Sequence, residues 1–335
     1  MSNEFNDEFV KEIPDHVRQR LDQTYEKIRF QSKKKKKHNI WMRMTAAACC
    51  LLIVGIASTS EPVKAAISGI FKFNDSGIEQ AVNAGFAEET DQSATNENVR
   101  ITLDSYFSDY NKIGFSFQLL FEDPTLLSGK VEWISLDVRL KNGDGEYIVE
   151  FIPDTKPLYG KSDYSVGVHV MNPIIEQKTG IAQFDTVFDS TEGNFPALSN
   201  AVIEVESINV QYANGEFKKI DGEWNLPLNK AAKPFEVVEY VARESDKIKI
   251  VKANGNPTSL SLTISIDGEP TETPFAIMKV VDEQGIEYEA GSTNMTVKKG
   301  YTLISTTFPI SSFVHAEKLQ LIVGNEEVEL TKTND

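Results

Sequence analysis

The sequence predicts a mainly β protein with a short cytoplasmic helix and one transmembrane helix, followed by two extracellular antiparallel β domains, the second an immunoglobulin-like sandwich. Three observations predict this class. Five consecutive lysines lead into an apolar run, Ile40 to Ser60. After about residue 90, apolar and polar side chains alternate over short stretches. Turn sequences rich in Asn and Gly separate these stretches, as expected of antiparallel strands.

These patterns divide the chain into consecutive parts. We expect a cytoplasmic amphipathic tail at 1–39, a transmembrane helix at 40–60, juxtamembrane helices at 61–90, an extracellular β domain at 91–230 and the immunoglobulin-like sandwich at 231–335.

The apolar run is long enough to cross a bilayer. Its positions 40–60 would rise about 31 Å as a helix, against a hydrocarbon thickness of about 30 Å. Its one charge, Arg43, lies in the first turn, where a long side chain can reach the head groups. The lysines are concentrated on one flank, which predicts a single-pass protein of the cell membrane with a cytoplasmic N-terminus and extracellular C-terminal domains. They are Lys33, Lys34, Lys35, Lys36 and Lys37.

Two other interpretations of the run fit less well. A cleaved signal peptide has a short charged leader, whereas 39 residues with amphipathic structure precede this run. A lipoprotein anchor at Cys49 or Cys50 would need the apolar residues before the modified cysteine, and about half of them follow it. We therefore expect the span to be retained in the membrane.

Charge differs between the two sides of the span. Residues 1–43 hold 11 Lys or Arg and 7 Asp or Glu, a net +4, so the total of −16 leaves −20 for the rest. The acidic outer part is a poor candidate for binding nucleic acid. It contains no cysteine, and a disulfide-free exported segment weakly favours a Gram-positive envelope.

The tail carries one apolar stripe at helical spacing. Four of its members, on a helix expected at about Pro14 to Gln31, are candidates for binding a partner: Val17, Leu21, Tyr25 and Ile28. One interpretation is an amphipathic helix on the inner leaflet. The other is docking in the groove of a cytoplasmic protein, which the acidic residues of the helical part favour because anionic lipid would repel them.

Outside the span, the sequence predicts two helical stretches, about Glu61 to Phe73 and Ser76 to Ala84, the second ending at Gly85. A polar loop, Thr90 to Ser93, should precede the first strands. Hairpin turns are marked by Asn142 to Gly145 and by Asn214-Gly215, the latter joining Ile203 to Tyr212 with Glu216 to Ile220.

A linker, Pro227 to Pro234, should separate the β domains. Beyond it, seven short strands suggest an immunoglobulin-like sandwich without the cysteine pair and core tryptophan of antibody domains. They are expected at Phe235 to Val241, Lys247 to Ala253, Leu260 to Ile266, Phe275 to Val281, Ile286 to Ala290, Tyr301 to Phe308 and Leu319 to Val323.

The order of these parts resembles the membrane-anchored anti-sigma factors of Gram-positive bacteria, which restrain extracytoplasmic-function sigma factors. The resemblance rests on Ile13 to Val17 in the tail, the lysine block and span, Pro62 to Ile67, Gly77 to Ala81, and Gly222 to Pro227. It implies an uncharacterised extracellular β domain, a cytoplasmic sigma factor as partner and no direct contact with nucleic acid. Many anti-sigma domains are longer and ligate zinc, whereas this tail has only His16 and His38, so a short metal-free helix is expected.

No enzymatic motif or cofactor site is found. The chain lacks the nucleophile elbow, the zinc-protease helix motif and a phosphate-binding glycine loop. His169 and His315 are isolated in sequence, and such histidines are usually packed or at the surface. Asn142 to Gly145 lacks the ligand spacing of a calcium loop and fits a turn. We therefore expect neither catalysis nor a cofactor.

The expected function is that of a signalling protein whose tail sequesters a sigma factor and whose β domains respond to an unknown extracellular ligand. Release by proteolysis is a further expectation, because Val63 and Ala65 match the small residues read by signal-peptidase-like enzymes. The same residues could simply begin a packed helix. Two alternatives of other classes remain, a membrane-anchored binding or structural protein of the envelope without a cytoplasmic partner and an unrecognised extracellular hydrolase.

Overall fold

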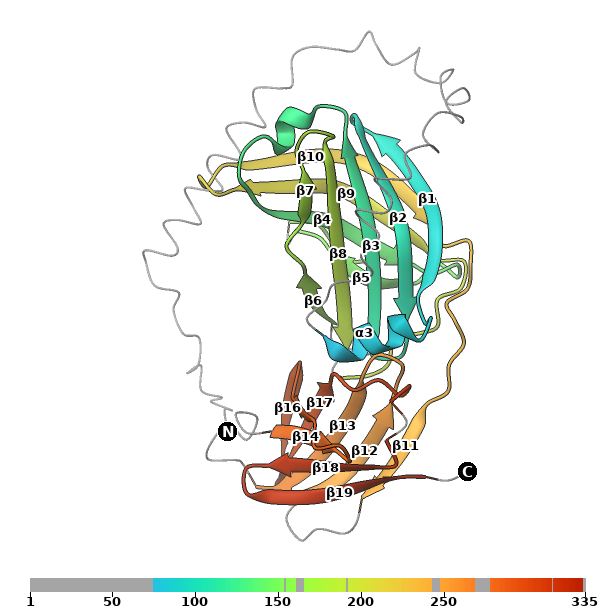
Figure 1. The fold of residues 1–335 in the computed structure, drawn as a ribbon, viewed down its shortest axis with the longest axis vertical. Helices are drawn as coiled ribbons and strands as arrows, with labels where there is room; N and C mark the ends of the chain where they lie inside the picture. Colours follow the sequence, from blue (N-terminus) through green and yellow to red (C-terminus); the bar gives the residue numbers. More distant parts are fainter. Residues whose placement is uncertain are drawn as a thin grey trace, which may run out of the picture. The chain divides into compact units, whose positions relative to one another are not determined.

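A computed structural model describes residues 75–153, 155–160, 166–190, 192–242, 248–268, 278–314 and 316–333. Residues 66–335 form one compact unit, and its described part is mainly β, which confirms the mainly β character of the predicted class (Figure 1). Within that part, no helix is long and apolar enough to cross a membrane. The predicted tail, span and first juxtamembrane helix lie outside the described residues.

The first β region contains two antiparallel sheets. One has the order β1-β2-β3-β8-β6, with β7 also paired to β8. Its strands are β1 (Glu88–Asn96), β2 (Val99–Ser108), β3 (Lys112–Phe121), β6 (Val166–Val170), β7 (Ile174–Glu176) and β8 (Ile181–Ser190). The other has the order β10-β9-β4-β5, with β4 (Val131–Lys141), β5 (Tyr147–Phe151), β9 (Val202–Tyr212) and β10 (Phe217–Pro227); a 3-10 turn, η1 (Pro124–Leu127), precedes β4.

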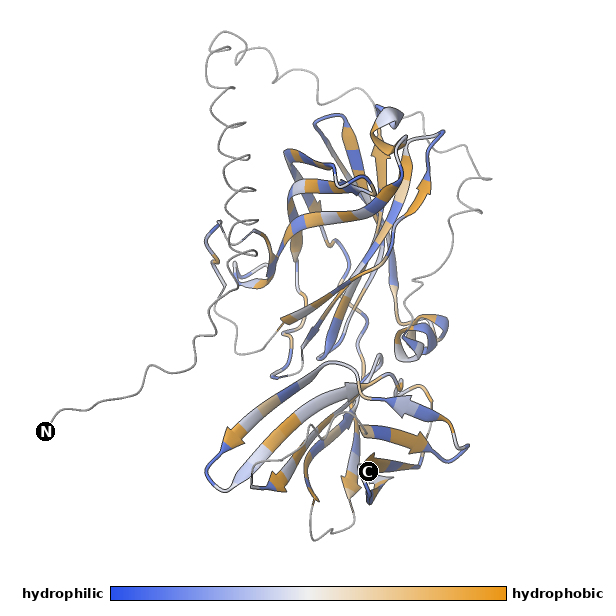
Figure 2. Cartoon of the chain, turned by 90° about the vertical axis from the view of Figure 1, so that its left-hand side faces the viewer, coloured by the Kyte–Doolittle hydropathy of each residue, from blue (hydrophilic) through white to orange (hydrophobic). Residues whose placement is uncertain are grey.

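A single hydrophobic core joins the two sheets. Phe115, Phe117 and Leu119 occupy every second position of β3 and are fully buried in this core. They share one face of the sheet because successive side chains of a strand point to opposite faces. The alternation is visible as orange and blue bands along the strands (Figure 2). Trp224 of β10 is also fully buried, and its Nε1 donates a 2.9 Å hydrogen bond to the Val99 carbonyl of β2. That bond connects one sheet to the other.

Two sequence-based expectations for this region are wrong. Thr90 to Ser93 is not a loop but part of β1, whose residues alternate between partly buried and exposed. An edge strand needs no strongly apolar face, so the hydrophobic pattern could not reveal it. The strand after Asn214-Gly215 does not stop at Ile220 but runs to Pro227, past a register shift between Asp221 and Trp224 that interrupts the simple alternation.

The second β region has nine strands around its own core. Their order is β15-β14-β18-β19-β11-β12-β13-β17-β16. Each of the seven predicted segments overlaps a strand, but β16 and β19 were not predicted. The bounds are β11 (Val238–Ala242), β12 (Ile248–Gly255), β13 (Leu260–Asp267), β14 (Met278–Asp282), β15 (Glu287–Glu289), β16 (Thr293–Lys298), β17 (Tyr301–Phe308), β18 (Lys318–Val323) and β19 (Glu326–Lys332).

Helix α3 (Ser76–Asn83) lies where the sequence predicts it. Asp75 caps its first turn by accepting a hydrogen bond from the Ile78 amide at 3.1 Å. Gly85 follows the helix with φ +84°, a left-handed conformation that glycine adopts without strain. In Figure 1 the helix crosses the ends of β2, β3 and β8, and Ile78 and Ala81 are buried there in a small apolar cluster with Phe86, Phe107 and Val187.

The same helix is hydrogen-bonded to the second β region. Ser76 Oγ donates to the Pro309 carbonyl at 2.7 Å, and Gln80 Oε1 accepts from the Ser311 amide at 3.2 Å. Gly77 lies so close that an added Cβ would be 2.2 Å from the Thr258 carbonyl oxygen. Any larger residue at this position would therefore force α3 away from the second β region.

A buried carboxylate joins the two β regions beside this helix. Asp109, 2% exposed, follows β2. Its Oδ1 accepts hydrogen bonds from the amides of Asn111 and Lys112, both at 2.8 Å, which close the β2–β3 turn. Its Oδ2 accepts from the Thr258 amide at 2.9 Å and the Thr258 hydroxyl at 2.6 Å. One side chain thus satisfies donors from both regions.

The predicted linker is held against the first β region. Leu228 is buried in the first core, and its amide donates to the Ala201 carbonyl. The Lys230 carbonyl accepts a hydrogen bond from the Tyr106 hydroxyl at 2.5 Å. Farther along, the Phe235 ring lies edge-on to Phe86, with centroids 5.9 Å apart. The two ends of the predicted linker are thus fixed by specific contacts.

Candidate functional site

A cavity of about 300 Å³ lies within the compact unit, between α3, the first β region and the second. Its lining is predominantly apolar, with Ile78 of α3, Met171, Val187 of β8 and Pro309 contributing. Concave, mostly apolar pockets with a few polar groups are where proteins most often bind small molecules. The charged groups of this cavity therefore decide what it could hold.

Lys112 and Asp75 form one charged pair in its wall. Lys112 begins β3, and its Nζ forms a hydrogen-bonded ion pair with Asp75 Oδ2. The Lys112 side chain is 7% exposed, so the charge is buried against its partner. Asp75 remains the cap of α3 through its other oxygen. This pair thus connects the helix to the sheet and leaves little positive charge free for a ligand.

Asp189 and His169 form the second charged pair. His169 of β6 has Nε2 3.3 Å from Asp189 Oδ1 of β8, and Ser292 Oγ of the second β region is 3.4 Å from the same nitrogen. Asp189 pairs in register with Gly167. A Cβ at Gly167 would meet Asp189 Oδ1 at 2.2 Å, so the glycine makes room for the carboxylate.

The pair shifts both pKa values. Asp189 raises the pKa of His169 above its ordinary value, against the opposing effect of burial. Burial acts to raise the pKa of Asp189, but His169, Ser292 and the charge of Lys112 outweigh it and hold that pKa below its ordinary value. Asp189 is therefore a carboxylate at neutral pH, although it is only 2% exposed.

Titration of the His169 ring by NMR should show a pKa above its ordinary 6.5. Asp189→Asn should return it toward that value, because the carboxylate is the main cause of the shift. Since the folded-state pKa is raised, the stabilisation from protonated His169 is fully present below about pH 6.5 and is lost as pH rises through the folded-state pKa. An unchanged His169 pKa in Asp189→Asn would contradict the pairing.

A second polar cluster lies on the sheet of β4, β5, β9 and β10. Arg139, 2% exposed, forms ion pairs with Glu150 and Glu206 and donates to the Pro157 carbonyl at 3.1 Å. Its guanidinium lies 4.5 Å from the centroid of the Tyr159 ring. These contacts attach the chain at 156–160 to the sheet. Because each charge is already paired, we interpret the cluster as structural.

The site residues expected from sequence are not tested by this structure. Val17, Leu21, Tyr25 and Ile28, the lysines Lys33 to Lys37, and Val63 and Ala65 lie outside the described residues, as does His315. Asn142 to Gly145 forms a turn, in which Asp144 Oδ1 accepts from the Glu146 amide at 2.9 Å. In the described ranges, no group of three or more His, Cys, Asp or Glu side chains could hold a metal.

The cavity itself was missed by sequence reasoning. His169 was interpreted as an isolated histidine, but the fold places it beside Asp189 and Ser292, which are 20 and 123 positions farther along the chain. No spacing rule connects residues on two strands and a distant loop. Gly167, two positions before His169, was the available local signal, since a glycine within a strand often marks a close approach.

A family model matches part of the chain. The model of a domain of unknown function, DUF4179, matches residues 34–120. No curated protein matches the chain. The crystal structure of the conserved domain protein from Bacillus anthracis is similar over 71% of this chain and 77% of that one, with 16% sequence identity and a TM-score of 0.46.

Proposed function

We propose that the chain is a single-pass membrane anti-sigma factor, whose cytoplasmic tail binds an extracytoplasmic-function sigma factor until the extracellular β domains respond to an envelope signal. The position of α3 carries this proposal. It is the first described element after the apolar run, and it contacts both β regions through Lys112 and Pro309. A change at the junction of those regions would therefore act on the chain that leads to the membrane.

The extent of the family match gives further support. Residues 34–120 begin in the lysine block, include the apolar run and α3, and end in β3. A single family model thus covers the proposed anchor, α3 and two of the strands on which α3 packs, β2 and β3. This is the arrangement expected if the anchor, α3 and the first strands of the sheet act together in signalling.

The tail stripe provides the direct test. Leu21→Asp in the full chain should weaken capture of the sigma factor at least tenfold, because docking would bury an unpaired carboxylate. Lys35→Gln removes a charge outside the stripe and should leave capture unchanged. Co-purification of the full chain with extracytoplasmic-function sigma factors of the same organism measures both. Equal capture by wild type and Leu21→Asp would reject the docking.

Capture of no sigma factor by the wild-type chain would favour the alternative of a membrane-anchored envelope-binding or structural protein.

The membrane topology distinguishes both of these functions from that of an intracellular protein. With Cys49 and Cys50 replaced by serine, a cysteine at position 20 should be shielded from an impermeant reagent in intact cells, and one at position 150 should react. The reverse pattern would overturn the proposed orientation.

Proteolysis is the proposed route of release, since a single helix without a charged pathway has little means of transmitting a shape change. Cleavage after Ala65 would remove the β domains from the membrane-bound stub. Ala65→Trp should keep the chain intact and the partner bound under envelope stress, as followed by immunoblotting, because the bulky ring does not fit a protease subsite for small residues. Fragments of unchanged size in this variant would place the cut elsewhere.

A further inference from the structure

We propose that the cavity beside α3 binds a small organic cation, a protonated amine carried on a short apolar body. The proposal concerns the ligand of the extracellular part and is independent of the anti-sigma function, since binding can be measured on the chain alone. It rests on the lining of the cavity, on one unsatisfied carboxylate oxygen and on the balance of charges around it.

The apolar lining sets the body of the ligand. Ile78, Met171, Val187 and Pro309 come from α3 and from both β regions. A volume of about 300 Å³ is at the small end of ligand pockets and suits a short chain or a single ring. Such a body would gain binding free energy on leaving water, in proportion to the apolar surface that it buries.

Asp189 provides the polar contact. Its Oδ1 makes no hydrogen bond within the described residues, and His169 Nε2 at 3.3 Å is an ionic neighbour instead of an aligned donor. A buried acceptor without a donor is costly. This oxygen is buried beside the His169 ring, so an ammonium group would reach it by displacing that ring and would then form a charge-assisted bond, which is the stronger kind.

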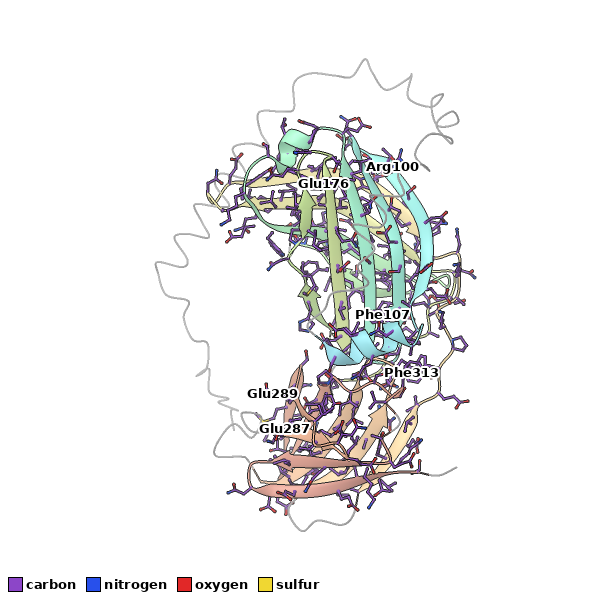
Figure 3. The ribbon with its side chains drawn as sticks, viewed as in Figure 1. Arg100, Phe107, Glu176, Glu287, Glu289 and Phe313 are labelled. Carbon is purple, nitrogen blue, oxygen red and sulfur yellow. The ribbon has the colours of Figure 1, made fainter. Side chains whose placement is uncertain are left out.

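The sign of the charge favours a cation. The carboxylates in the lining are Asp75, Asp189 and Glu289, and the basic groups are Lys112 and His169. Lys112 is already paired with Asp75. Glu289 is exposed on β15 (Figure 3). Two carboxylates of the lining, Asp189 and Glu289, therefore remain against one basic group of the lining, His169. An anionic ligand would meet two carboxylates with at most one free positive charge.

His169 should compete with the ligand for Asp189. Protonation of the ring places a positive charge beside the same carboxylate, whereas the neutral ring leaves the negative charge of Asp189 uncompensated. The other charged groups facing His169 are Asp75, Lys112 and Glu289, and the first two neutralise each other. Binding of the cation should therefore be tighter at pH 8 than at pH 6.

The experiment is isothermal titration calorimetry of the full chain in detergent with three probes of matched length: hexylammonium, hexanol and hexanoate. We expect hexylammonium to bind at least tenfold more tightly than hexanol, and hexanoate not to bind. Asp189→Asn should remove the preference for hexylammonium over hexanol. Glu287→Gln, which removes an exposed charge two positions from Glu289 and outside the lining, should keep it.

A second variant tests the proposal even if Asp189→Asn does not fold. His169→Gln removes the competing proton from a side chain that is 60% exposed, and it should make hexylammonium affinity equal at pH 6 and pH 8 while wild type differs. A lysine-containing tripeptide shows whether the ammonium can also come from a peptide side chain. Preference for hexanoate, no binding of hexylammonium, or equal hexylammonium affinity in wild type and Asp189→Asn would each overturn the proposal.

Discussion

Replacing Trp224 by alanine is expected to lower the free energy of unfolding of the first β region by about 3–5 kcal/mol, the usual cost of truncating a buried tryptophan. Trp224 is fully buried in the first core. Its Nε1 bond to the Val99 carbonyl also connects β10 to β2. Gly222 lies against the ring, where an added Cβ would be 2.5 Å from it. The space around Trp224 is therefore closely filled, and neighbouring side chains could not easily move into the void that alanine would leave.

Urea denaturation of the purified chain, followed by circular dichroism, measures this loss. Trp224→Phe keeps an aromatic ring but removes the indole donor and part of the ring volume, so it should cost less than Trp224→Ala, roughly 1–3 kcal/mol. Trp133→Ala is the matched control, because Trp133 of β4 is only partly buried. If Trp133→Ala and Trp224→Ala destabilise the chain equally, Trp224 is not the connection between sheets that its burial indicates.

Asp109→Asn should weaken the junction between the two β regions by about 2 kcal/mol. The carboxylate accepts two hydrogen bonds at each oxygen. The amide nitrogen of asparagine accepts none, so two donors lose their partner at roughly 1–3 kcal/mol each. Burial raises the pKa of Asp109, which shows that a buried charge carries a cost; the neutral amide removes it and offsets part of the loss.

Hydrogen exchange at the Thr258 amide measures this change directly, since that amide bonds to Asp109 Oδ2. Faster exchange of about thirtyfold would correspond to 2 kcal/mol. Asp144→Asn is the control, because Asp144 bonds in a similar turn but is exposed and lies away from the junction. Unchanged protection of Thr258 in Asp109→Asn would mean that the two regions are joined mainly by other contacts.

The strands with regular alternation could be predicted from sequence, and those without it could not. Phe115, Phe117 and Leu119 identify β3 because they all enter one core. β19, which was not predicted, begins with Glu326 and Glu327, pairs with β18 and buries Val328 and Leu330. Its two apolar positions are too few for a periodic signal. Pairing with β18, which is not visible in the sequence of β19, makes this segment a strand.

The candidate site depends on tertiary structure to a greater degree. Lys112, His169 and Asp189 occupy three strands of one sheet, and Glu289 belongs to the other β region. Their proximity follows from strand order and from the contacts of α3, neither of which is encoded as local spacing. Only the helix itself was predictable, through its apolar positions and the glycine that follows it.

The docking of α3 also has a consequence for the order in which the chain is made. Ser76 bonds to Pro309, 233 positions later. At synthesis rates of about 5–20 residues per second, the helix emerges roughly 10–50 seconds before its last binding surface exists. During that interval α3 lacks its contacts with the second β region. If the chain is exported as proposed, a molecule whose export stalls before Pro309 would present an undocked α3 to proteases at the membrane, and completed molecules would present the docked form.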